Sequence, residues 1–206
     1  MTPSPSDTAD TPRSLEAFAA DFAARVEADR WTADNDTIHI YVSRDQWVTA
    51  ATAARDEDDL GFFSFLSAVD WARDVAVGEP ADDVDNLVER YEVLVRLSST
   101  TNSTALILST SLAKDDAWLD SLVPVYAGAA WHEREAAEMF GIDFRGHPNL
   151  VKLYLPEAFE GHPLRKSFAL GAREVKPWPG TVDVEELPST TNVEAAARSG
   201  EEGEGS

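Results

Sequence analysis

Residues 131–168 place the tightest limits on the fold, because a helical pattern is followed there by two strong turn signals. The helical pattern covers 131–140 and ends at Gly141, since glycine adopts the left-handed conformation that closes a helix at little steric cost. Two similar triplets follow, Gly146-His147-Pro148 and Gly161-His162-Pro163. Glycine frees the backbone in each, and proline biases the preceding histidine toward extended geometry. Long regular elements are therefore expected before residue 141, and an extended arm after it.

The helix predicted at 131–140 lacks a single apolar face, because Trp131 is flanked on its surface by Glu135 and Glu138. Glu138 can pair with Arg134, four residues before it. The whole chain carries a formal charge of −21, yet residues 131–168 hold six acids and five bases. Two interpretations stay open, a helix contacted on several sides in a docking surface and a solvated helix with one buried aromatic.

Periodic apolar residues before this stretch predict an α+β fold. Four strands are expected, at 37–42, 60–71, 89–98 and 104–110. They give a mixed or antiparallel sheet of about four strands with helices on one face, in which the nearly all-apolar run at 60–71 is the central strand, buried on both faces. A doubly wound α/β fold is the alternative, which we disfavour because the last strands have no crossover helices between them.

Capping residues predict the other helices. Ser14 can cap a helix whose apolar residues recur through Val26, and Ser43 with Gln46 resembles a capping box before a second helix. Asp115 or Asp116 can cap a short third helix over 118–122. Beyond residue 141, alternation over 151–155 predicts a short strand that Pro156 ends.

The chain divides by composition into four parts. A disordered N-terminus at 1–13 precedes the core domain at 14–140, and the motif-bearing arm at 141–182 precedes a disordered acidic tail at 183–206. Trp178 stands between two prolines in the arm and is expected to need a partner surface.

Composition excludes several classes of function. The absence of cysteine rules out disulfides, thiolate nucleophiles and cysteine-ligated clusters or zinc. The acidic balance disfavours direct binding to nucleic acid or anionic lipid, so any membrane contact is expected through a partner. The N-terminus lacks the features of a signal peptide, which favours the cytoplasm, and the acidic segment 72–88 is typical of a loop rather than a cation site.

An enzyme acting alone would have to use the histidines. His132, His147 and His162, with Glu133 or Glu135, could supply metal ligands or a general base. Two of these histidines lie in Gly-His-Pro turns and none forms a helical His-x-x-x-His pair. We therefore predict no catalytic, cofactor-binding or metal-binding residue in this chain.

The motifs themselves resemble a known family. Glu133-Arg134-Glu135, then Met139-Phe140-Gly141-Ile142 through Gly146-His147-Pro148, then Leu155-Pro156-Glu157 through Gly161-His162-Pro163-Leu164-Arg165-Lys166, are similar to the C subunit, or thirty-kilodalton subunit, of respiratory complex I. The likeness is strong over 131–168 and extends in outline from residue 15 to about 170. Glu138 stands where the family has aspartate, and Ser167 where it usually has an acid, which puts local salt bridges in doubt.

This resemblance implies an accessory subunit of a proton-pumping NADH:quinone oxidoreductase, peripheral on the cytoplasmic side of the membrane. Flavin, clusters and the quinone site then belong to other subunits, and the expected partners are subunits B, D and I. The homologous subunit of a membrane-bound nickel–iron hydrogenase or another quinone-linked dehydrogenase is the alternative. The residues expected to bind partners are Trp131, Glu133, Arg134, Glu135, Glu138, Phe140, His147, Pro148, Glu160, His162, Pro163, Arg165, Lys166 and Trp178.

Overall fold

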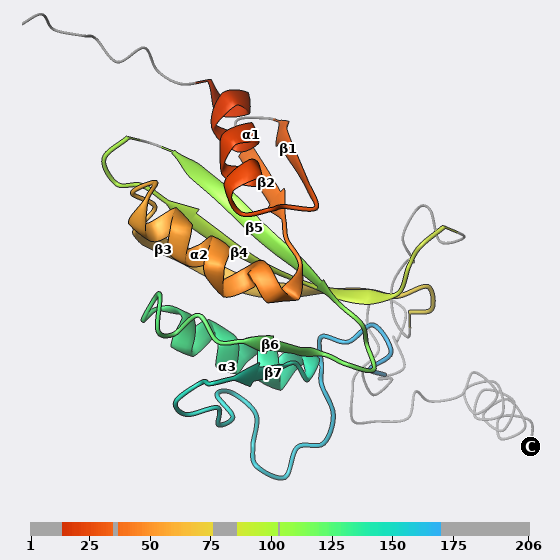
Figure 1. Ribbon diagram of the computed structural model, residues 1–206. Helices are drawn as coiled ribbons and strands as arrows, with labels where there is room; N and C mark the ends of the chain where they lie inside the picture. Colours follow the sequence, from red (N-terminus) through yellow and green to blue (C-terminus); the bar gives the residue numbers. More distant parts are fainter. Residues whose placement is uncertain (1–13, 35–36, 76–85, 103, 170–206) are drawn as a thin grey trace, which may run out of the picture. The chain divides into compact units, whose positions relative to one another are not determined.

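The computed structural model describes residues 14–34, 37–75, 86–102 and 104–169 (Figure 1). All of these lie within one compact unit, Met1–Leu170. The expectations about the N-terminus at 1–13, Trp178, the acidic tail and most of the acidic segment at 72–88 lie outside the described residues.

The α+β fold is confirmed, with a mixed sheet of five strands in the order β1-β2-β5-β4-β3. β2 (Thr37–Tyr41), β3 (Phe62–Trp71), β4 (Arg90–Ser98) and β5 (Ala105–Leu112) match the four predicted strands. β2 and β5 pair in parallel and the other neighbours are antiparallel. The fifth strand, β1 (Arg30–Asp34), was missed because it is an edge strand whose residues are mostly exposed, so it has no apolar alternation.

β3 is an edge strand, and the prediction that it is central was wrong. Its apolar run does not reflect burial on both faces. Leu66 and Ala68 are buried on the face that carries the helices, whereas Ser67 on the other face is exposed and Phe62 retains 53% of its surface. The central position belongs to β5, between β2 and β4.

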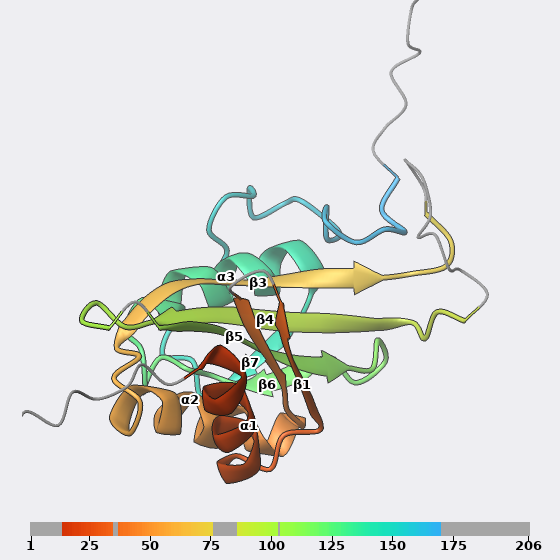
Figure 2. The same ribbon diagram turned by 90° about the horizontal axis from the view of Figure 1, so that it is seen from above.

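The core lies on one face of the sheet. Val93, Val95 and Leu97 of β4 are fully buried there, and they pair in register with neighbours on β3 and β5 that are mostly buried as well. α1 (Leu15–Arg25) and α2 (Trp47–Asp56) pack on this core, and Figure 2 shows them together on one side of the strands. α3 (Ala129–Phe140) joins the same core beside β3, where Phe140 meets Tyr91 of β4 edge to face.

Capping residues predicted the start of one helix correctly and that of another wrongly. Ser14 caps α1 as predicted, since its hydroxyl accepts a hydrogen bond from the Ala17 amide at 3.2 Å. The capping box at Ser43 was wrong, because Ser43 makes no side-chain cap. A single 3-10 turn, η1 (Arg44–Gln46), leads instead into α2.

The short helix predicted after Asp115 was also wrong. Those residues form β6 (Trp118–Asp120), which pairs in parallel with β7 (Asp143–Arg145) just after α3. Leu119 is fully buried and Phe144 nearly so, and this pairing across α3 outweighs the local capping signal. The two strands hold the ends of α3 and its flanking loops together, which positions the site described next.

Candidate docking surface

α3 buries two carboxylates with different partners. Glu133 is 0% exposed, and its two oxygens accept hydrogen bonds of 2.6 Å from the Ser121 hydroxyl and from the Leu122 amide. Burial raises the pKa of Glu133 to about 7, although these two hydrogen bonds act in the opposite direction. The side chain therefore fastens α3 to the segment after β6.

Glu138 binds the arm through three backbone amides. Its oxygens accept from Leu153 and Tyr154 at 2.9 Å and from Leu155 at 2.6 Å. Burial acts to raise its pKa, but the three amides and the charge of Lys152 outweigh burial and leave the pKa of Glu138 lowered. The prediction of a strand at 151–155 was wrong. The amides of Leu153, Tyr154 and Leu155 donate to the Glu138 carboxylate and not to a neighbouring strand.

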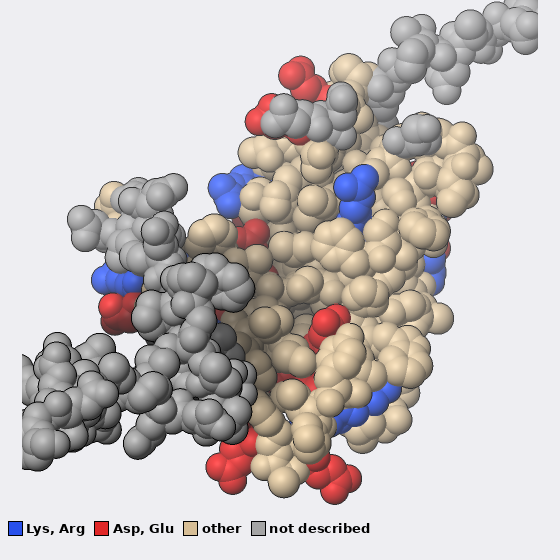
Figure 3. Space-filling view, turned by 180° about the vertical axis from the view of Figure 1, so that it is seen from behind, with Lys and Arg blue, Asp and Glu red and all other residues tan. Residues whose placement is uncertain are grey.

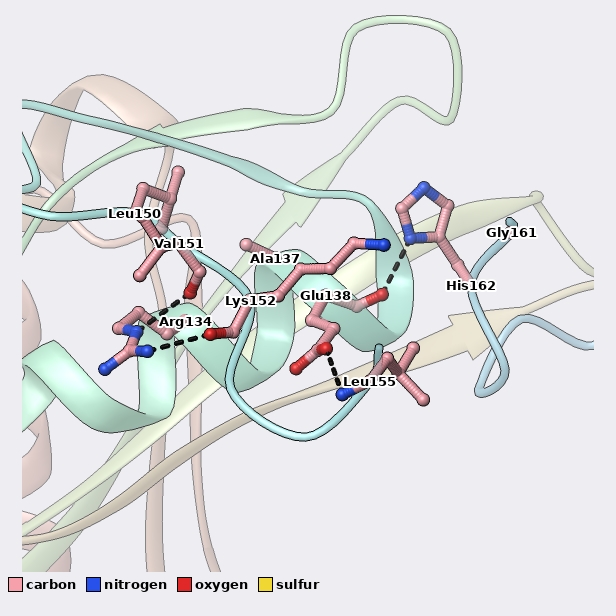
Figure 4. Close-up of a pocket in the computed structure, with 9 residues that line it drawn as sticks. All are labelled: Arg134, Ala137, Glu138, Leu150, Val151, Lys152, Leu155, Gly161 and His162. Atoms are coloured by element: carbon pink, nitrogen blue, oxygen red, sulfur yellow. Dashed lines mark hydrogen bonds between the residues drawn. The ribbon is translucent and has the colours of Figure 1, made fainter. Parts of the chain in front are cut away.

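Arg134 holds the same part of the arm by its carbonyls (Figure 4). Its guanidinium donates to the Val151 and Lys152 carbonyls, both at 2.9 Å, and lies 5.1 Å from the centre of the Trp131 ring. The expected pair of Arg134 with Glu138 does not form among the described residues. Both side chains instead clamp one stretch of backbone, one by its carbonyls and the other by its amides.

The second Gly-His-Pro triplet closes the C-terminal end of α3. Gly141 adopts the predicted left-handed conformation, with φ of 73°. The last three helix carbonyls, which have no partner inside the helix, accept from the arm: Glu138 from His162 Nδ1 at 2.7 Å, Met139 from the Leu164 amide at 3.1 Å, and Phe140 from Arg165 Nε at 2.6 Å.

The first Gly-His-Pro triplet contacts the other end of the same helix. His147 Nε2 lies 3.0 Å from the Ala130 carbonyl, while its Nδ1 accepts from the Asn149 amide at 3.0 Å. These contacts fix the tautomer with the proton on Nε2. The two Gly-His-Pro triplets therefore have the same structural role, since the histidine of each binds a backbone carbonyl of α3.

Two lysines fix the arm further along. Lys152 Nζ donates to three carbonyls between residues 156 and 159, at 2.8 to 3.2 Å. The Lys166 amide donates to Asp70 of β3 at 2.8 Å, and the same carboxylate is 2.6 Å from Lys114 Nζ. The arm is therefore held against α3 and β3 over its whole described length.

Large apolar side chains remain exposed on this scaffold. Trp131 is 62%, Tyr154 60% and Val151 51% exposed, and we name these three the α3–arm surface. Trp131 and Tyr154 line one hollow, while Val151 lines a neighbouring pocket of about 200 Å³ with Arg134 and Glu138 (Figure 4). The sequence did not point to Val151 or Tyr154, since only the three-dimensional course of the arm leaves them uncovered.

The other predicted partner-binding residues are spread around this surface. Glu133, Glu138 and Phe140 are buried, whereas Arg134, Glu135, His147, His162, Pro163 and Arg165 are half-buried. Pro148, Glu160 and Lys166 are exposed. The three histidines are not brought together, because His132 contacts the Leu66 carbonyl and the other two bind opposite ends of α3. No group of three His, Cys, Asp or Glu able to hold a metal occurs among the described residues.

Comparison with known proteins decides the family. The model of the family described as the 30 Kd subunit of the respiratory-chain NADH dehydrogenase matches residues 40–174. The chain belongs to this family. The expected membership in the complex I thirty-kilodalton family is confirmed, and the chain is a subunit of an NADH–quinone oxidoreductase.

Individual relatives agree with this assignment. The chain is 37% identical over 140 residues to the C subunit of NADH-quinone oxidoreductase of Roseiflexus sp. strain RS-1, covering 67% of this chain and 73% of that one. It is 41% identical over 93 residues to the C/D subunit of Chromohalobacter salexigens, covering 45% of this chain but 16% of that longer one.

Two solved structures share the fold at low sequence identity. The trypsin-resistant fragment (1–134) of Nqo5 matches with a TM-score of 0.51 and 18% identity, over 66% of this chain and 98% of that one. A chain of the membrane-bound sulfane sulfur reductase, an archaeal respiratory membrane complex, matches with a TM-score of 0.54 and 15% identity, over 68% and 75%. Among the described residues, no helix is both long and apolar enough to cross a membrane.

Proposed function

We propose that this chain is a cofactor-free accessory subunit in the peripheral arm of respiratory complex I. The complex passes electrons from NADH through flavin and iron–sulfur clusters to quinone and couples this transfer to proton translocation. The chain contacts subunits B, D and I and lies on the cytoplasmic side of the membrane, which it reaches only through the complex. Relatives whose name joins C and D in one subunit support the D subunit as one neighbour.

The observation that carries this proposal is the α3–arm surface. Two large aromatic side chains, each about 60% exposed, stand on a backbone fixed by the clamp of Arg134 and Glu138. Rigid exposed aromatic groups are the side chains that contribute most to protein–protein binding. They need little ordering when a partner arrives, because their supports are already in place.

The remaining predicted partner-binding residues take two roles. Glu133, Glu138, His147, His162 and Arg165 position the surface, because their polar atoms are already bound within the chain. Glu135 belongs with them, since its charge lies close enough to the Tyr154 hydroxyl to raise the pKa of that tyrosine. The exposed Glu160 and Lys166 are placed to meet charges of the partner.

Assembly of the complex tests the α3–arm surface. Trp131→Ser and Tyr154→Ser should each lower the yield of assembled complex and its quinone-linked NADH oxidation, while the thermal midpoint of the isolated chain stays within about 2 °C of wild type. Trp31→Ser is the matched control, since Trp31 is 38% exposed on β1 at the opposite edge of the sheet from β3. Normal assembly of both serine variants at α3 and the arm would overturn the proposal.

The cofactor-free role has its own test. Elemental analysis and an absorption spectrum of the purified chain should show no stoichiometric metal, flavin or cluster. Zinc or iron retained after dialysis would revive an enzyme that uses His132, His147 or His162.

The alternative expected from the sequence was the homologous subunit of a membrane-bound hydrogenase or another quinone-linked dehydrogenase. Relatives named as C subunits of NADH-quinone oxidoreductase support complex I over it. The likeness to a chain of the sulfane sulfur reductase complex, at 15% identity, is a likeness of fold alone. Neighbouring genes provide an independent check, because a flavin- and NADH-binding subunit encoded alongside is expected for complex I.

A further inference from the structure

The face of the sheet opposite the helices carries a second set of features. Alternation along the strands turns Tyr41, Ser109, Leu94 and Ser67 to this face, in one row across β2, β5, β4 and β3. The next row holds His39, Ile107 and Arg96. None of the described helices packs there, since the buried core uses the alternate residues of the same strands. We name this side the open face, and Figure 3 views the molecule from behind, where uncharged residues prevail with separate basic and acidic groups among them.

Two arginines on the open face are held by aromatic rings. Arg30 lies 3.6 Å above the centre of the Tyr41 ring, and Arg90 lies 5.2 Å from that of Trp71. A guanidinium stacked on a ring is oriented but keeps N–H groups at its edge for a carboxylate. Among the described residues Arg30 makes no ion pair, whereas Arg90 lies 3.5 Å from Glu92 and also donates from Nη1 to the Val88 carbonyl at 3.0 Å.

Glu92 cannot neutralise both Arg30 and Arg90, because its oxygens already have other partners. It is 7% exposed, and its Oε2 accepts from the Trp71 indole at 2.8 Å. His39 lies 4.0 Å from its other oxygen, and His39 is itself bonded to the Ser109 and Tyr41 hydroxyls. The network therefore fixes the aromatic and basic groups in place, and Glu92 offsets the charge of Arg90 while Arg30 keeps no ion pair among the described residues.

A hollow of about 360 Å³ is lined by both arginines. Ser43, Ser109 and Ser111 also line it, and Asp29 is the one carboxylate among its described lining residues. Guanidinium groups and hydroxyls together are the groups that recognise a carboxylate, because both can donate hydrogen bonds to its oxygens. Asp29 and the nearby Glu92 balance the charges of the two arginines, but the Arg30 guanidinium makes no ion pair among the described residues and keeps N–H groups for a carboxylate.

We propose that the open face is a second docking surface, and that its occupant is an acidic segment of another protein subunit with a carboxylate between Arg30 and Arg90. Half-buried Val69, Leu94 and Ile107 on the same face suit apolar residues flanking that carboxylate. Charge complementarity favours a local acidic side chain over a polyanion, because the chain's charge of −21 repels an extended phosphate backbone.

Cross-linking within the assembled complex tests this proposal. A benzoylphenylalanine placed at Ser67, an exposed position on the open face, should cross-link under light to a peptide of another subunit that contains Asp or Glu beside apolar residues. The same group at Ala17, exposed on α1, is the control position and should give little product. Mass spectrometry of the linked peptides reads out both.

Charge variants show whether the arginines matter. Arg30→Gln combined with Arg90→Gln should reduce the Ser67 cross-link about tenfold, because two interfacial cations are lost. Arg145→Gln removes one charge on β7, with a side chain 52% exposed, and should leave the cross-link unchanged. If the double variant fails to fold, Arg96→Gln on the same face should still lower the yield.

Several results would overturn the proposal. They are a cross-link to lipid, to a second copy of this chain, or to a peptide without acids, and an equal yield from the double variant. These results are separate from the proposed function, because the α3–arm variants test assembly at a different surface.

Discussion

Glu133 and Glu138 lie five residues apart on one helix and are both buried, yet their pKa values move in opposite directions. Glu133 has two hydrogen bonds, and burial dominates. Glu138 receives three backbone amides and lies near Lys152, so its charged form is favoured. The number and charge of donors, rather than burial alone, decide which carboxylate stays ionised.

The pKa of Glu133 predicts how stability depends on pH. Its folded-state pKa of about 7 exceeds the ordinary value of 4.5, so its contribution to stability is full below 4.5 and is lost as pH rises through 7. Glu133→Gln keeps an acceptor for the Leu122 amide without the charge. The stability of wild type relative to this variant should fall by up to about 3 kcal/mol between pH 4.5 and 8.

Urea unfolding of both proteins across that pH range measures this difference. Because the other acids are common to both proteins, their titration cancels. Parallel curves would show that folding does not raise the pKa of Glu133.

Glu138→Gln tests the clamp on the arm. The amide side chain is a weaker acceptor than a carboxylate for three backbone amides, so the variant should lose about 1 to 3 kcal/mol of stability. Amide hydrogen exchange should rise most at Leu153, Tyr154 and Leu155, beyond the increase that the loss of global stability causes elsewhere. Glu135→Gln, a half-buried position on the same helix, should leave exchange at those three amides unchanged.

Several single residues could be assigned from the sequence because their signals are local. Ser14 as a helix cap and Gly141 as a left-handed terminator each depend only on neighbouring backbone. The partners of Glu138 and Arg134 could not be predicted, because they come from a segment 15 to 18 positions away whose course is set by tertiary contacts.

At the scale of elements, the end of α3 is the most sensitive point. Gly141→Ala would place a methyl group against the Arg165 guanidinium and 2.6 Å from His162 Nε2, at a backbone position with φ of 73°. Gly146→Ala has a similar φ of 80° but meets nothing within 4 Å. The alanine at 146 should cost about 1 to 2 kcal/mol from backbone strain alone, and the alanine at 141 should cost clearly more.

Chemical unfolding of the two alanine variants measures the difference between them. The excess at 141 reports the contacts of His162 and Arg165 with the helix end. Equal losses would mean that the arm moves aside freely, and that it does not hold the helix terminus.

Element types were predictable where apolar periodicity was strong, and positions in the sheet were not. The hairpin of β4 and β5 follows from alternation along each strand. The edge position of β3 could not be predicted from its sequence. An apolar run is compatible with a central strand and also with an edge strand that one helix covers and whose other large side chains are half-exposed. The predictions of a helix at β6 and of a strand at 151–155 were wrong for a common reason. The backbone groups of each segment pair with groups distant in the sequence, β6 with β7 and the 153–155 amides with Glu138.

At the scale of the whole molecule, the ends of the chain should differ in importance. Removal of 1–12 and of 188–206 should leave assembly intact, because these segments have no apolar period with which to pack. Removal of 171–180, which contains Trp178, should weaken docking. Co-purification with the partner subunits checks both deletions, and equal binding by the 171–180 deletion would show that this segment is no interface.

The protein family was easier to predict than the geometry of the site, because a gapless motif in the sequence identifies the family. The family followed from residues 131–168, whereas the surface proposed for docking depends on Val151 and Tyr154, which periodicity had placed in a strand.

The closure of α3 by residues 162–165 has a consequence for biosynthesis. The Phe140 carbonyl accepts a hydrogen bond from Arg165, 25 positions further on. This contact at the helix end cannot form until nearly all of the described chain has left the ribosome. A nascent or prematurely ended chain can form the sheet and yet lack the fixed arm beneath Trp131 and Tyr154. On the proposed docking role of the α3–arm surface, partners would meet its final form only after residues 162–165 have been synthesised.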